Sequence, residues 1–84
     1  MNAKTLYGIF ETTRKHDLPD LTIGLAVYRH ENPGHVTDDT DRPIREFIGR
    51  HYDALVAAYQ KGPVAFEDAV AFCEAADKEK AEKG

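Results

Sequence analysis

The clearest hydrophobic pattern in the chain spans residues 42–61, where apolar side chains recur every three or four positions and charged side chains fall mostly on the other face. The residues at this helical spacing are Ile44, Phe47, Ile48, His51, Leu55, Val56 and Tyr59. Asp41 is well placed as the N-cap, and Pro43 falls in the first turn, where its missing N–H leaves no hydrogen bond unmade. With Gly62 at its end, the pattern predicts one continuous helix over 42–61.

A second apolar stripe follows the Gly62–Pro63 pair, which breaks helices. Its members are Phe66, Ala69, Val70, Cys73 and Ala76, with Phe72 beside them. Acidic residues near the start of this segment and lysines near its end suit the helix dipole. We therefore expect a helix over 65–80 that packs antiparallel to the preceding one, and a frayed tail over 79–84.

The first thirty residues fit two structures. Residues 21–28 alternate between larger apolar and other side chains, which is typical of a strand, but they also fit helical spacing. Asp17 suits either the left-handed position that ends a helix or the N-cap of the next one. We predict helices over 4–16 and 19–31, which gives an all-α bundle of about four helices. The alternative is an α+β fold in which an N-terminal β-hairpin precedes two helices.

The length of 84 residues predicts one small domain over residues 1–84, which is marginal alone and gains from dimerising or from a partner. Because Cys73 is the only cysteine, an internal disulfide and a cysteine-based zinc cage are excluded. The first apolar run is too short for a secretion signal, and no segment is long and apolar enough to span a bilayer. We expect a soluble, cytoplasmic protein that does not enter a membrane.

The histidines and carboxylates do not form a recognisable metal or catalytic motif. His30 and His35 flank a turn, and no two histidines are four residues apart on a helix, as a zinc pair would be. Asp39 and Asp41 lack the further ligands of a calcium loop. Cys73 lies on an apolar stripe, where a thiol behaves as a small hydrophobe. We therefore predict no metal, no cofactor and no enzymatic activity.

Gly49 stands inside the strongest helical pattern, where a glycine costs about 1 kcal/mol relative to alanine. We expect a close neighbour to explain it, more readily another helix of the same chain than a partner.

The segment 29–43 and the helix after it offer the best candidate for a recognition surface. The residues assigned to partner binding are Asp38, Asp39, Asp41, Arg45, Glu46 and Tyr52. The net charge of −4 argues against direct nucleic-acid binding and favours a protein partner with a basic surface.

No motif identifies a family. In length, acidity and expected helix count the chain is similar to small inhibitors such as bacteriocin immunity proteins and phage anti-defence proteins. This similarity implies a non-enzymatic, acidic inhibitor that docks on a basic protein that handles nucleic acid. The alternative is a structural or assembly subunit that homo-oligomerises through helix packing, for example as a homodimer. In that case apolar residues of the segment 6–28 would lie in the interface.

Overall fold

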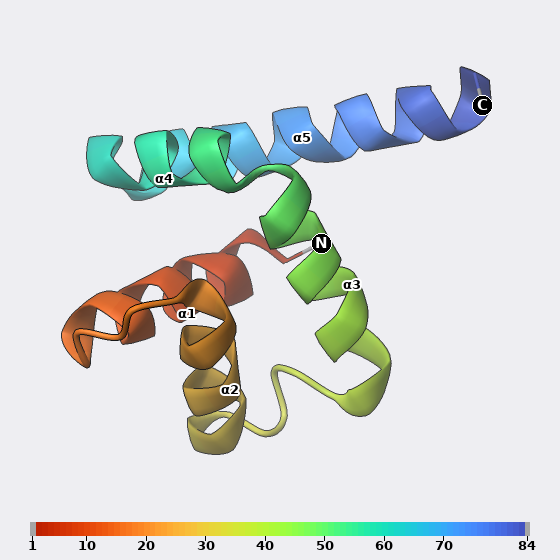
Figure 1. The fold of residues 1–84 in the computed structure, drawn as a ribbon. Helices are drawn as coiled ribbons and strands as arrows, with labels where there is room; N and C mark the ends of the chain where they lie inside the picture. The colour runs from red at the N-terminus through yellow and green to blue at the C-terminus, as the bar shows by residue number, and fades with distance from the viewer. Residues whose placement is uncertain (1, 84) are drawn as a thin grey trace.

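The computed structural model describes residues 2–83, which form five α-helices and contain no strand (Figure 1). The helices are α1 (Ala3–Lys15), α2 (Leu21–Glu31), α3 (Asp38–Arg50), α4 (Tyr52–Lys61) and α5 (Pro63–Lys83). The all-α prediction is confirmed, and the alternative with an N-terminal β-hairpin is wrong. The predicted number of helices is one too few, because the segment 42–61 does not form a single helix.

Side-chain hydrogen bonds cap the N-termini of the first two helices. The Asn2 side chain accepts a hydrogen bond from the Lys4 backbone N–H at 2.9 Å, which starts α1. Asp17 adopts the left-handed conformation, with a φ of 50°, just after α1 ends. Asp20, and not Asp17, caps α2 by accepting from the Thr22 N–H at 2.8 Å. For this reason α2 begins two residues later than the sequence pattern predicts.

The start of α3 differs from the prediction. Thr37 is the N-cap, and its backbone N–H donates to Thr40 Oγ1 at 2.8 Å. Asp41 therefore lies in the first turn of the helix, where its negative charge suits the dipole, and is not the N-cap. Pro43 stands inside the helix instead of in its first turn.

The predicted helix 42–61 is interrupted at His51. The His51 N–H still bonds to the Phe47 carbonyl at 3.1 Å, but its own φ and ψ of −118° and 24° leave the helical region. In Figure 1 the chain turns sharply here, so that α4 runs across the direction of α3. The apolar spacing continues through the turn, which is why the sequence pattern conceals it.

Helices α4 and α5 lie side by side and are joined through Gly62 (Figure 1). Gly62 has a φ of 125°, a conformation that side chains disfavour, so a glycine is needed at this turn. The predicted pairing of these two helices is confirmed. Helix α5 continues to Lys83, and fraying of the 79–84 segment stays a prediction.

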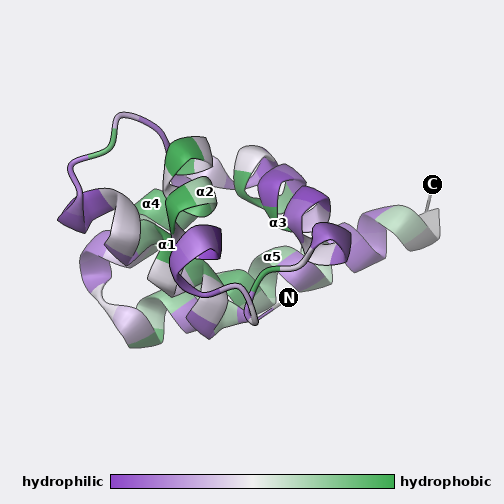
Figure 2. Cartoon of the chain, turned by 90° about the horizontal axis from the view of Figure 1, so that it is seen from below, coloured by the Kyte–Doolittle hydropathy of each residue, from purple (hydrophilic) through white to green (hydrophobic). Residues whose placement is uncertain are grey.

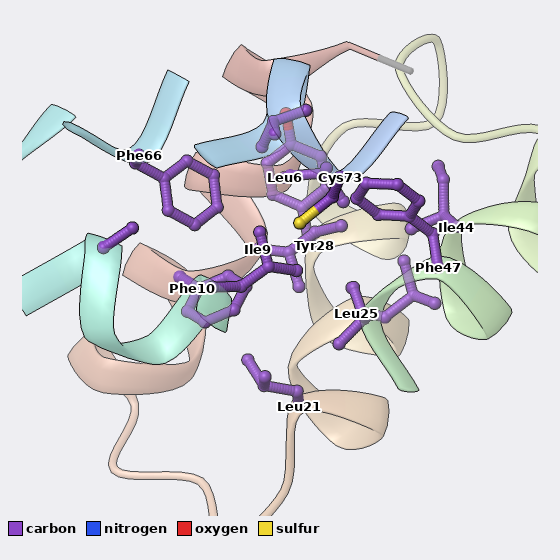
Figure 3. Close-up of a cluster of buried hydrophobic side chains, with 14 of the residues drawn as sticks. Leu6, Ile9, Phe10, Leu21, Leu25, Tyr28, Ile44, Phe47, Phe66 and Cys73 are labelled. Atoms are coloured by element: carbon purple, nitrogen blue, oxygen red, sulfur yellow. The ribbon is translucent and has the colours of Figure 1, made fainter. Parts of the chain in front are cut away.

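The core is built around α1, which packs against both α2 and α5. Figure 3 shows the buried side chains that meet there, including Leu6, Ile9, Phe10, Leu21, Leu25, Phe47, Phe66 and Cys73. Several of these belong to the segment 6–28, which the assembly hypothesis would place in an oligomer interface. These side chains are buried within one chain, whereas Ile23 of the same segment is 43% exposed, so an interface through the segment 6–28 stays a prediction.

The close contact between α1 and α2 depends on two glycines. A Cβ at Gly24 would lie 1.7 Å from Thr13 Oγ1, and one at Gly8 would lie 2.6 Å from Tyr28 Cε2. At Gly49, for which the sequence predicts a close neighbour, such a Cβ would meet nothing within 4 Å apart from the adjacent residues and the backbone of its own helix. The prediction of intramolecular packing at Gly49 is therefore wrong.

Candidate protein-binding surface

The structure places the six predicted binding residues along α3 and at the start of α4. Five of them, Asp38, Asp39, Asp41, Arg45 and Glu46, belong to α3, and Tyr52 is the first residue of α4. In Figure 2, α3 is largely hydrophilic, whereas the apolar segments of the other helices gather toward the middle of the bundle. The outer side of α3 is therefore a charged surface that adjoins one exposed aromatic ring.

Two of the three aspartates are engaged within the chain. Arg29, near the end of α2, donates a hydrogen bond to Asp38 and lies 3.6 Å from Asp41. The bond to Asp38 is the main cause of the raised pKa of Arg29. Arg45 also pairs with Asp41, one turn earlier on α3. The contacts of Arg29 link the end of α2 to the start of α3 across the connector. The acidic cluster therefore has a structural role within the chain.

Asp39 is the aspartate of this cluster that remains without an ion pair to another residue of the described chain. Glu46 pairs with Arg42 at 2.9 Å, as expected for oppositely charged side chains four residues apart. Surface pairs of this kind contribute little to stability and are screened by salt. The charged surface is thus a mixed one, in which Asp39 offers the least committed negative charge.

Tyr52 borders a groove that the sequence pattern did not indicate. The groove has a volume of about 140 Å³ and lies between the start of α2 and the junction of α3 and α4. Its apolar lining comes from the buried residues Leu21, Leu25 and Ile48. Its rim includes Arg45, Gly49 and the ring of Tyr52, which is 49% exposed. At Gly49 the space beside the helix is open, because no side chain of another helix packs against this position.

The histidines have separate surroundings. His35 Nδ1 lies 2.8 Å from the hydroxyl of the buried Tyr28, and His16 lies 3.7 Å from Glu31. His30 lines an open recess of about 550 Å³ between α2 and α3. Within residues 2–83, no group of three or more histidine, cysteine, aspartate or glutamate side chains is arranged to hold a metal ion.

The structure also shows a polar cluster that sequence reasoning missed. Asp77 Oδ2 accepts from Arg50 at 3.0 Å, and Asp77 Oδ1 lies 2.9 Å from His51 Nε2. Burial on its own would raise the pKa of Asp77, but the hydrogen bonds from Arg50 and His51 outweigh it and lower that pKa. The available clue was the position of Asp77 on the stripe of Cys73, where a carboxylate needs a partner.

This cluster does not make Cys73 a nucleophile. The side chain is only 4% exposed, and burial, with a smaller effect from the charge of Asp77, raises the pKa of its thiol. Reactive cysteines have lowered thiol pKa values and partial exposure, so Cys73 has the character of a core residue. The cluster of Arg50, His51 and Asp77 instead ties the junction of α3 and α4 to α5.

The exposed residues of α5 were also missed. The sequence pattern places Phe72 beside the buried stripe, but its side chain is 76% exposed in the structure. Val64, two turns earlier, is 74% exposed. Phe72 directly precedes Cys73 in the sequence, and the offset of about 100° between adjacent residues of a helix takes the Phe72 side chain away from the core.

Comparisons of the chain with protein-family models, curated proteins and solved structures found no match. Among the described helices, none has both the length and the apolar character needed to cross a membrane.

Proposed function

We propose that the chain is a non-enzymatic protein-binding module that docks through the groove beside Tyr52. The observation that carries this proposal is the combination of an exposed tyrosine with a small open groove of apolar lining. Tyrosine is enriched among the residues that dominate binding energy at protein interfaces, particularly next to pockets that exclude water. No other helix of the chain packs against Gly49, so packing within the chain does not explain a glycine at this position of α3. A partner that approaches the groove closely at Gly49 would explain it.

The surroundings of the groove favour a partner with a basic surface. Asp39 lies on the same helix as the groove residues Arg45 and Gly49, and the whole chain carries a net charge of −4. A negative surface speeds encounter with a positive one and disfavours direct contact with phosphates. We propose, as the finer form of the function, a small acidic inhibitor of the anti-defence or immunity type that acts on a basic, nucleic-acid-handling protein.

Affinity capture from the native host, with matched variants, tests the proposal. Tyr52→Ala removes the exposed ring, and Phe72→Ala is its control because it removes an exposed ring from α5. Asp39→Lys reverses a charge without breaking the ion pairs of Arg29. Its control is Asp68→Lys, which reverses an exposed charge on α5. We expect the first variant of each pair to lose the captured protein and the second to keep it.

A captured protein that binds Tyr52→Ala and Asp39→Lys as tightly as the unchanged chain would exclude this surface. Its affinity should also fall as the salt concentration rises, because attraction between exposed charges is screened. An affinity that is insensitive to salt would contradict a basic partner.

A further inference from the structure

The groove beside Tyr52 has the size of a single apolar side chain. Its volume is about 140 Å³. An apolar protein cavity of about 150 Å³ is large enough to hold one benzene molecule. The floor of the groove is aliphatic, since it is formed by Leu21, Leu25 and Ile48, which are themselves buried in the core. The groove can therefore accept one aliphatic side chain from outside, and it is too small for a longer segment of a partner.

The positive charges near the groove are already balanced within the chain. Arg45, which lies on the rim, pairs with Asp41. Arg29 pairs with Asp38 and lies 3.6 Å from Asp41. Asp20 also lies on the rim, and within residues 2–83 it makes no ion pair. The uncompensated charge of the rim is therefore negative.

Two groups of the rim favour a positive charge on the partner. The carboxylate of Asp20 is exposed and accepts one hydrogen bond, from the Thr22 N–H to Oδ1 at 2.8 Å. Its Oδ2 has no hydrogen bond to another described residue and can accept one from a partner. The ring of Tyr52 is 49% exposed, and the face of a tyrosine ring attracts the cations of lysine and arginine.

We infer that the groove takes one aliphatic side chain of the size of leucine from the partner, and that a neighbouring lysine or arginine contacts Asp20 and the ring of Tyr52. The inference rests on the proposed docking function and specifies what the partner presents to the groove. At Gly49 the partner backbone can approach closely, because the space beside α3 is open there. An acidic residue in place of the basic one would be repelled by Asp20.

Blocked dipeptides are the probes for this inference. N-acetyl-leucyl-lysine amide carries both features, N-acetyl-leucyl-glutamate amide reverses the charge, and N-acetyl-alanyl-lysine amide lacks most of the aliphatic side chain. Two-dimensional NMR of the backbone amides, with each probe at millimolar concentration, measures binding. The leucyl-lysine probe should shift the signals of Thr22, Gly49 and Tyr52 to saturation. The other two probes should bind about tenfold more weakly.

The role of Asp20 is tested by Asp20→Asn. Asparagine caps a helix as well as aspartate does, so this variant removes the charge and keeps the start of α2. It should weaken binding of the leucyl-lysine probe by about threefold to tenfold and reduce the difference between the lysyl and glutamyl probes. Asp17→Asn is the matched control, because it removes an exposed charge from the same connector outside the groove, and asparagine tolerates the left-handed backbone there. It should bind as the unchanged chain does.

The use of the groove itself is tested by Gly49→Leu. Gly49 lines the groove and has open space beside it, so a leucine at this position should fill the groove without disturbing the fold. This variant should weaken binding of the leucyl-lysine probe by about tenfold or more. Ala75→Leu, which adds the same side chain to an exposed position of α5, is its control and should leave binding unchanged.

A leucyl-lysine probe that shifts none of the three signals, or a glutamyl probe that binds equally well, would overturn the inference. Capture of the host protein separates this failure from that of the docking function. If Tyr52→Ala loses the captured protein and Gly49→Leu keeps it, docking beside Tyr52 stands but insertion into the groove does not. If both variants keep it, the docking function fails as well.

Discussion

His51 Nε2 lies 2.9 Å from Asp77 Oδ1, a contact that joins residues 26 positions apart in the sequence. His51 is the residue at which the chain leaves α3 and enters α4, and Asp77 belongs to α5. The ring of His51 also packs against Phe47, with the ring centres 4.9 Å apart. The direction of α4 relative to α3 is thus stabilised from α5, and the groove beside Tyr52 depends on that direction.

The first prediction concerns Asp77 and pH. Its pKa in the folded state is lowered, so its contribution to stability is complete above the ordinary aspartate pKa of about 3.9 and is lost as the pH falls through the lower folded value. Asp77→Asn should therefore lower the melting temperature by a few degrees at neutral pH, and this difference should shrink in acid.

Thermal unfolding monitored by circular dichroism between neutral pH and strong acid measures this effect. Asp68→Asn, which removes an exposed charge from α5 beyond its first turn, is the control and should differ little from the unchanged chain at either pH. If Asp77→Asn stayed equally destabilised in acid, the loss would come from altered packing and not from the charge of Asp77.

The second prediction compares two helical glycines. Gly24→Ala should destabilise the fold by about 1–3 kcal/mol or more, because its Cβ would lie 1.7 Å from Thr13 Oγ1. Gly49→Ala should stabilise it by about 0.5–1 kcal/mol, because nothing lies close to that position and alanine favours the helix. Urea denaturation of both variants measures the two free energies of unfolding.

A double variant separates the collision from other effects at Gly24. Thr13→Ala removes the colliding hydroxyl and also the hydrogen bond that Thr13 Oγ1 donates to the Ile9 carbonyl at 2.8 Å. Combined with Gly24→Ala, it should restore part of the lost stability. No recovery in the double variant would show that the hydroxyl is not the obstacle.

The third prediction compares the substitution of two phenylalanines of α5. Phe66 is 1% exposed and lies edge-on to Phe10, with ring centres 5.1 Å apart, so Phe66→Ala should cost about 3–5 kcal/mol. Phe72→Ala should change the free energy of unfolding of the dilute monomer by no more than about 0.5 kcal/mol. Equal losses from the two substitutions would mean that Phe72 is packed in the monomer.

The features of the fold that depend on residues close in the sequence could be predicted. Asp17 has the left-handed backbone that its place after a basic last turn suggests, and Gly62 ends α4 as its position indicates. These features depend on neighbours within a few residues. The turn at His51 could not be predicted in the same way, because its stabilising partner, Asp77, comes much later in the chain.

In the candidate site, too, single residues could be identified from the sequence, whereas contacts between distant segments could not. The sequence identifies Tyr52 as a possible anchor, and half of its side chain is exposed, but the groove beside it needs α2 to approach α3. The aspartates were visible in the sequence, whereas their pairing with Arg29 required the connector to fold back. Gly49 and Gly24 both stand at helical positions, and only the packed structure shows which of them has a close neighbour.

The last prediction concerns Cys73, whose thiol is buried and has a raised pKa. A thiol reagent attacks the thiolate, so the folded chain should react only when it opens. We expect labelling at mildly alkaline pH to be on the order of a thousandfold slower than in the unfolded chain. Phe66→Ala should react faster because it lowers the free energy of opening, whereas Phe72→Ala should react at the unchanged rate. Rapid labelling of the folded, unchanged chain would contradict the core position of Cys73.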